Sequence, residues 1–130
     1  MKKTILTTAC ILGILAVVLG AFGAHGLKKL VEADAVNSFE TGVRYQMYHV
    51  FLLFVVGSLP FLSNKKKQIV YYLVLIGVFL FSFSIYLLSI NDLTLFDFKS
   101  IGFLTPIGGI FLIAAWIYLA ITILQSKEFK

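Results

Sequence analysis

Apolar residues in this chain fall into four long runs separated by short polar stretches. The hydrocarbon core of a bilayer is about 30 Å thick, so a helix rising 1.5 Å per residue needs about 20 residues to cross it. Each run meets that length, and none contains Lys, Asp or Glu. The pattern predicts an all-α integral membrane protein, a bundle of four transmembrane helices at about residues 4–24, 44–62, 69–90 and 105–124.

The connections refine these boundaries. The polar turn at 63–68 is short, so the second and third helices are expected to be antiparallel neighbours. Pro60 biases the residue before it away from helical backbone and favours an end of the second helix there. Thr105 followed by Pro106 resembles an N-cap with a first-turn proline. The fourth helix is therefore expected to start there, with residues 101–104 at the membrane interface.

The first connection has a helical pattern of its own. Asn37 and Glu40 have the spacing of a capping box, so the second helix is expected to begin near Ser38, outside the hydrocarbon. Before that point, charged residues alternate with apolar ones, which predicts a short amphipathic helix lying on the membrane between the first two spans. Its apolar positions in the segment 26–43 are Leu27, Leu30, Val31 and Ala35.

Composition agrees with a membrane location. The chain has 130 residues, of which 60% are hydrophobic and 13% charged. A single domain of this length cannot bury so much apolar surface in water, so residues 1–130 are expected to form one transmembrane domain covered by lipid. The net charge of +5 comes from bases that flank the apolar runs, which indicates topology signals and not nucleic-acid binding. Cys10 is the only cysteine, so an intrachain disulfide is excluded.

The distribution of basic residues predicts an orientation. Four spans would place both termini and the turn at 63–68 on one side, which carries seven bases against four on the other. The positive-inside rule then predicts a multi-pass plasma-membrane protein with both termini in the cytoplasm. A cleaved signal peptide ending at 21–24 is the alternative, but its apolar stretch is longer than a usual signal. The seven bases are Lys2, Lys3, Lys65, Lys66, Lys67, Lys127 and Lys130.

Small residues recur at helical spacing inside three of the runs. Such positions let helix backbones approach closely where no hydrophobic effect drives association. We expect these residues to pack helices within the bundle, with a dimer face or a substrate path as alternatives. They are Gly13, Ala16, Gly20, Gly77, Ser84, Gly108 and Ala115.

Polar residues also gather near one predicted membrane edge, at the end of the first helix and the start of the second. Arg44 follows Glu40 by four residues, the favourable order for an ion pair on a helix. His49 lies about 7–8 Å further along than Arg44, a depth at which ionisable groups are costly and often functional. The candidate cluster is His25, Glu40, Arg44, Tyr45, Gln46, Tyr48 and His49.

Three interpretations of this cluster remain open. It could be a structural network in which the two histidines tie the first helix to the second. It could bind a small ligand, ion or proton through His49. It could ligate haem through His25 and His49, whereas two histidines are too few for a zinc site, so no metal is expected.

No nucleotide-binding, metalloprotease or paired-cysteine motif is present, and Asp92 and Asp97 lie in a predicted loop. We therefore expect a non-enzymatic structural or accessory component without a cofactor. A small transporter or ligand-binding protein is the alternative, and a bis-histidine haem protein a weaker one. The expected partners are membrane lipid and an oligomeric copy or another membrane protein, with no nucleic acid.

Four motifs carry a resemblance that covers nearly the whole chain. They are residues 20–27 (GAFGAHGL), 39–49 (FETGVRYQMYH), 80–86 (LFSFSIY) and 105–109 (TPIGG). In these the chain resembles the YgdD/YwdK-like family of small bacterial membrane proteins, a domain of unknown function. The resemblance implies an inner-membrane protein with about four spans and implies no activity.

Overall fold

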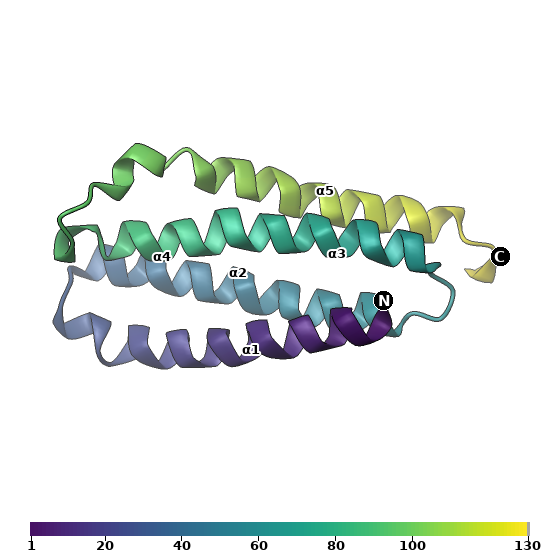
Figure 1. The fold of residues 1–130 in the computed structure, drawn as a ribbon, viewed down its shortest axis with the longest axis horizontal. Coiled ribbons are helices and arrows are strands. Elements are labelled where there is room, and N and C mark those ends of the chain that lie inside the picture. The colour runs from purple at the N-terminus through teal and green to yellow at the C-terminus, as the bar shows by residue number, and fades with distance from the viewer. Residues whose placement is uncertain (130) are drawn as a thin grey trace.

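The computed structural model describes residues 1–129, and within them every regular element is helical. Lys130, one of the bases used to predict orientation, lies outside the described residues. Figure 1 shows long helices running antiparallel, joined by short turns. In chain order the elements are α1 (Lys2–Ala24), the 3-10 turn η1 (Leu27–Lys29), α2 (Ala33–Ser58), α3 (Asn64–Val78), the π-helical segment η2 (Phe79–Phe83), α4 (Ser84–Ser89), η3 (Asn91–Leu93), η4 (Phe98–Ile101), α5 (Leu104–Gln125) and η5 (Lys127–Phe129).

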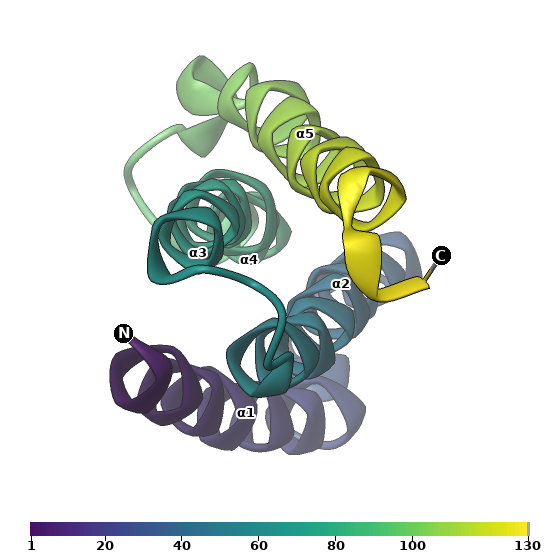
Figure 2. The same cartoon turned by 90° about the vertical axis from the view of Figure 1, so that its right-hand side faces the viewer.

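The bundle has two inner and two outer helical columns. Seen from its end, α2 and the column formed by α3, η2 and α4 lie in the middle, with α1 and α5 on opposite sides (Figure 2). α1 packs mainly on α2, and α5 packs mainly on α3 and η2. Both termini and the turn between α2 and α3 lie at one end, which we call the terminal end (Figure 1). The opposite end, with residues 25–32 and 90–103, is the loop end.

The side chains sort into an inner and an outer apolar surface. Ile5, Leu53 and Val74 are fully buried between the helices. The outward faces are also apolar, and many large hydrophobic side chains there are exposed, as at Ile14 and Ile110. Three helical stretches, Lys2–Lys29, Asn64–Ser89 and Phe98–Gln125, are long and apolar enough to cross a membrane. Lipid on the outer faces accounts for this exposed apolar surface.

The separate amphipathic helix expected between the first two spans is not confirmed. The structure has one 3-10 turn at Leu27–Lys29, and α2 already begins at Ala33. The expected capping box is wrong, because Asn37 lies inside α2, where its carbonyl accepts a hydrogen bond from Thr41 Oγ1. Helix formation extends this far because the stretch contains no proline and its apolar residues bury themselves in the bundle, Phe39 at 2% exposure.

α2 ends four residues before the predicted limit of its span. Leu59 has extended backbone angles, as the following Pro60 requires. The Lys67 ammonium, buried at 7% exposure, donates a hydrogen bond of 2.9 Å to the carbonyl of Gly57. A cation at the C-terminal end of a helix satisfies an orphan carbonyl and opposes the helix dipole. Lys67 is therefore an internal cap as well as a charge at the terminal end.

Two helix boundaries in the second half also differ from expectation. The third helix is interrupted by the π-helical segment Phe79–Phe83, which the hydropathy pattern does not signal. α5 begins at Leu104, one residue before the predicted start, and Thr105 is not its cap. The Thr105 hydroxyl instead bonds the hydroxyl of Ser84. Thr105 therefore bonds a side chain of α4 and not the backbone at the start of its own helix, as the sequence had suggested.

Candidate functional site

Gln46 is the central polar residue of the bundle. Its side chain is fully buried on α2. Its Nε2 donates to the carbonyl of Leu12 at 2.7 Å, and its Oε1 accepts from the hydroxyl of Tyr86, also at 2.7 Å. One amide therefore joins α1, α2 and α4. In a low-dielectric interior such bonds are strong, and an unpaired amide there would be costly.

One helical turn towards the loop end, α2 is held against the π-helical segment. Ser82 donates to the carbonyl of Gly42 at 2.7 Å. A Cβ on Gly42 would lie 2.7 Å from Cε1 of Tyr86, closer than real contacts allow. Glycine at this position lets the Tyr86 ring reach α2, so the Gly42 contact and the Gln46 bond depend on each other.

His49 connects α2 to α5. Its Nδ1 lies 2.6 Å from the carbonyl of Tyr45, and its Nε2 lies 3.1 Å from Nε1 of Trp116. A carbonyl can only accept and an indole N–H can only donate, so Nδ1 carries the proton and Nε2 accepts. The bonding pattern therefore assigns His49 as a neutral imidazole with both ring nitrogens occupied by protein.

The other members of the predicted cluster do not converge on His49. His25 is exposed at the end of α1. Arg44 is exposed and donates to Thr41 Oγ1 at 2.9 Å, and within residues 1–129 no ion pair joins it to Glu40. Tyr45 and Tyr48 are both partly exposed, with ring centroids 5.4 Å apart.

The two histidines lie at different depths. Gly13 of α1 faces Val50 of α2, since a Cβ on Gly13 would lie 3.5 Å from a Val50 methyl. His25 is twelve residues further along α1, roughly 18 Å at 1.5 Å per residue. His49, adjacent to Val50, is therefore too far away to share a ligand with His25. Within the described residues no three His, Cys, Asp or Glu side chains gather as a metal-binding group.

The small residues named from the sequence lie at helix contacts. A Cβ on Gly77 would meet Leu112 of α5 at 2.5 Å, and one on Gly108 would run into the backbone of Leu80 and Phe81. Gly20 faces Val43 in the same way, at 3.4 Å. The remaining positions are Ala16 and Ala115, which are buried, and Ser84, which bonds Thr105 and the carbonyl of Phe81.

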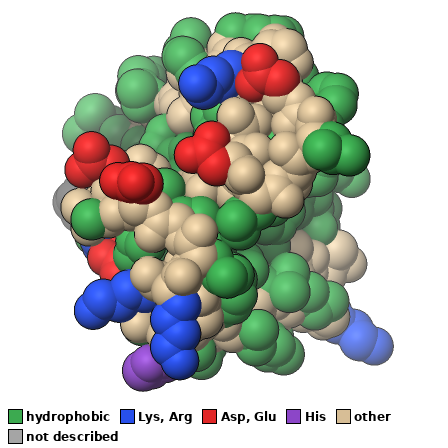
Figure 3. Space-filling model, turned by 90° about the vertical axis from the view of Figure 1, so that its left-hand side faces the viewer, with side chains coloured by type: hydrophobic (Ala, Val, Ile, Leu, Met, Phe, Trp, Pro, Cys, Tyr) green, Lys and Arg blue, Asp and Glu red, His purple; other side chains and the backbone are tan. Residues whose placement is uncertain are grey.

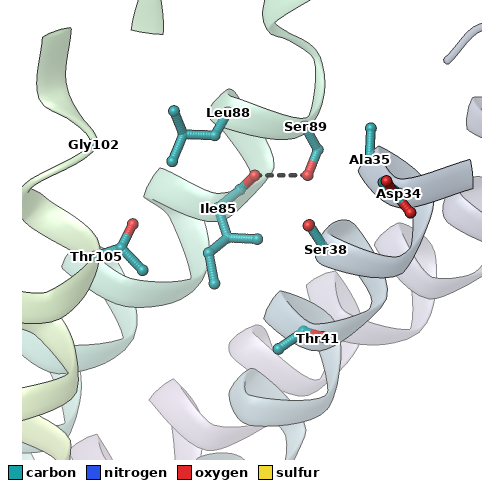
Figure 4. Close-up of a pocket in the computed structure, with 9 residues that line it drawn as sticks. All are labelled: Asp34, Ala35, Ser38, Thr41, Ile85, Leu88, Ser89, Gly102 and Thr105. Atoms are coloured by element: carbon teal, nitrogen blue, oxygen red, sulfur yellow. Dashed lines mark hydrogen bonds between the residues drawn. The ribbon is translucent and has the colours of Figure 1, made fainter. Parts of the chain in front are cut away.

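A groove runs between α2 and α5 on one side of the bundle. It consists of two cavities of about 400 and 360 Å³ that share Thr41, and we call it the α2–α5 groove. Figure 4 shows its outer part, where Ser38 of α2 faces Ile85 and Ser89 of α4, with Thr105 beyond them. The inner part is lined by Tyr45, Phe81 and Leu112, and ends at His49 and Trp116.

Sequence reasoning missed the partners on the later helices. Gln46 and His49 stand out as polar residues in an apolar run, but Tyr86 and Trp116 were not assigned to the site. Trp116 gave one signal, because a tryptophan in the middle of a span lies away from the aromatic belts at the membrane interfaces. A mid-span indole N–H needs an acceptor, and His49 supplies it.

Fold and site together define a small helical membrane protein whose buried polar side chains bond one helix to another. The chain belongs to the family described as "Protein of unknown function (DUF423)", whose model matches residues 19–109. The family expected from the four motifs is thereby confirmed.

The relatives are membrane proteins of similar length. The chain is 37% identical to a UPF0382 membrane protein of Haemophilus influenzae, covering 98% of this chain and 99% of the relative. It is 37% identical to the UPF0382 membrane protein YwdK of Bacillus subtilis, covering 92% and 94%. It is 33% identical to the UPF0382 inner membrane protein YgdD of Escherichia coli, covering 98% and 94%. These names record a membrane location and indicate no enzymatic role. No solved structure matches the chain.

Proposed function

We propose that this protein is a non-enzymatic structural or accessory component of the plasma membrane, with four spans and both termini in the cytoplasm. The spans are α1, α2, the column of α3, η2 and α4, and α5. α2 is too polar at its start to qualify by composition alone, but it packs between α1 and the column of α3, η2 and α4 over much of its length. Because the neighbours on both sides of α2 cross the bilayer, α2 packed between them crosses it too.

The position of polar residues along α2 supports this span. Asp34, Glu40 and Arg44 belong to the first half of the helix, nearest the loop end, and from Tyr45 to Ser58 the side chains carry no formal charge. At 26 residues α2 is about 39 Å long, which exceeds a hydrocarbon core of about 30 Å. Its first turns therefore extend into the headgroup region, where Arg44 can reach water or phosphate.

One observation carries the structural role. Within residues 1–129, every buried side-chain nitrogen and oxygen has a hydrogen-bond partner. Gln46 and His49 make four such bonds, and three of them cross from α2 to another helix, so both side chains hold the bundle together. A haem bound through His49 would have to displace the bond from Trp116, and His25 is too distant to be the second ligand.

Topology reporters test the arrangement of spans. Alkaline phosphatase, active only outside the cytoplasm, should be inactive when fused after residue 126 and active when inserted near Thr94. Green fluorescent protein should give the reverse result. An active phosphatase at the C-terminal end would overturn the orientation. Equal behaviour of reporters placed near residues 30 and 61 would show that α2 does not cross.

The structural role is tested separately, by purified protein with and without added haem. We expect no Soret band and no change in thermal stability. A stoichiometric Soret band that disappears in His49→Ala would replace the structural role with haem binding.

A further inference from the structure

We propose that the α2–α5 groove binds one amine-bearing zwitterionic phospholipid, with the chemistry of phosphatidylethanolamine, by holding one acyl chain between the helices. This rests on the four-span arrangement proposed above, because the loop end must lie at headgroup level. The groove goes beyond the structural role, since its lining includes residues that the internal hydrogen bonds do not use.

The polarity of the groove changes along its length as a lipid's does. Its α2 side is the stripe Asp34, Ser38, Thr41, Tyr45 and His49, at helical spacings of four, three, four and four. The outer members are acidic or hydroxylated and the inner ones aromatic. Across from them, α5 presents Thr105 at the outer end and Ile113 and Trp116 further in. A polar head at the loop end and an apolar chain beside Phe81 and Leu112 match this order.

The shape of the groove favours a single chain over a helix. Its inner end is closed by the hydrogen bond between Trp116 and His49 at 3.1 Å, which draws α5 against α2. Its floor is formed by Phe81 and Ile85 of the central column. A helix is about 10 Å wide and cannot enter a gap that two bonded helices close. An acyl chain can enter from the side, since lipid already covers the flanking faces.

The charges at the rim select the headgroup. Asp34 is exposed, and within residues 1–129 neither its carboxylate nor the hydroxyl of Ser38 bonds another group. Arg44 reaches the rim through its bond to Thr41. Asp34 and Thr41 are seven residues apart, roughly 10 Å along the helix. That is about the span of a phosphoethanolamine group with one hydrogen bond to Asp34 and one to Arg44.

The wider surface at this end carries slightly more acidic than basic side chains. Five of the six acidic residues in the chain lie at the loop end or in the first half of α2 next to it, together with four bases, and Figure 3 shows Asp and Glu side chains spread over this face, with His and most of the Lys and Arg at its lower edge. A primary ammonium donates hydrogen bonds to a carboxylate, which a quaternary choline cannot do. The rim therefore favours an ethanolamine head over choline or glycerol heads.

The experiment is native mass spectrometry of the full chain in mild detergent. Dioleoyl phosphatidylethanolamine, phosphatidylcholine and phosphatidylglycerol are added in turn at equal concentration. We expect one ethanolamine lipid per chain, retained about tenfold better than the others. Asp34→Asn should remove most of that preference, and Asp92→Asn, at the same end but outside the groove, should leave it intact. Equal retention of the three lipids by the parent would overturn the headgroup assignment.

A second pair of variants locates the acyl chain. The Cβ of Gly109→Ala would lie at ordinary contact distance from the Phe81 ring, 3.7 Å, so this variant should bind like the parent. Gly109→Leu extends into the groove and should lose the bound lipid while keeping its thermal stability without lipid. Unchanged binding by Gly109→Leu would contradict the site. If the parent is instead a dimer without bound lipid and Gly109→Leu is a monomer, a second copy of the chain covers the groove. Reporter topology is measured on the same variants, so a misinserted chain is distinguished from a failure to bind lipid.

Discussion

The indole N–H of Trp116 donates a hydrogen bond to Nε2 of His49 at 3.1 Å. This bond fixes the imidazole as the tautomer protonated at Nδ1 and joins α5 to α2 at the inner end of the groove. It links residues 67 positions apart in the sequence. A histidine that looked like a candidate ligand is thereby an internal acceptor.

The bond can be measured by a double-mutant cycle. Trp116→Phe should lower the free energy of unfolding by about 0.5–2 kcal/mol, because hydrogen bonds between membrane helices average about 0.6 and reach about 1.7 kcal/mol. In a His49→Leu background the same change should cost less, since the acceptor is already gone. Thermal denaturation in mild detergent provides the comparison. Fully additive effects would show that the two side chains do not interact.

The two histidines should respond differently to removal. His49→Ala leaves the Trp116 N–H without an acceptor and opens space in the bundle, so we expect a loss of about 1–3 kcal/mol. His25 is exposed, and His25→Ala should change stability by no more than about 0.5 kcal/mol. Equal losses would indicate that His25 is also buried among partners in the membrane. Both variants are compared by melting temperature at equal detergent concentration.

Tyr86 gives the corresponding test of the Gln46 network. Tyr86→Phe keeps the ring against Gly42 but leaves the Gln46 Oε1 without its donor, and should cost about 1–3 kcal/mol. Tyr72→Phe is the matched control. Tyr72 is 48% exposed, so the loss of its hydroxyl should leave the free energy of unfolding nearly unchanged. Hydrogen exchange should also rise near Leu12 if the amide of Gln46 rotates. Two variants of equal stability would contradict a buried bond at Tyr86.

Neighbouring glycines on α5 separate close packing from helix propensity. Alanine is better than glycine in a helix by about 1 kcal/mol, so Gly109→Ala should be neutral or stabilising. Gly108→Ala instead drives a methyl group into the backbone of Leu80 and Phe81, which cannot rotate away. Overpacking of this kind costs about 1–3 kcal/mol. A stable Gly108→Ala protein would show that α5 can move away from η2 at little cost.

Features that depend on residues close together in the sequence could be predicted, and features that depend on distant residues could not. The long apolar runs and the end of α2 before Pro60 depend on neighbouring residues, and these were predictable. The start of α2 was not, because burial of Phe39 against other helices extended it beyond the apparent cap. The role of Thr105 was mistaken for the same reason, since its partner Ser84 is 21 residues away in the sequence.

The sequence by itself determined a membrane location, helical class and approximate helix lengths, since apolar length and composition decide whether a segment enters a bilayer. It also identified Gln46 and His49 as polar residues that needed an explanation. Only the tertiary structure decided that Gln46 joins Leu12 and Tyr86, that His49 accepts from Trp116, and that His25 takes no part. Those pairings depend on which helix faces pack against each other, and the pattern of polar and apolar residues along the sequence does not specify that.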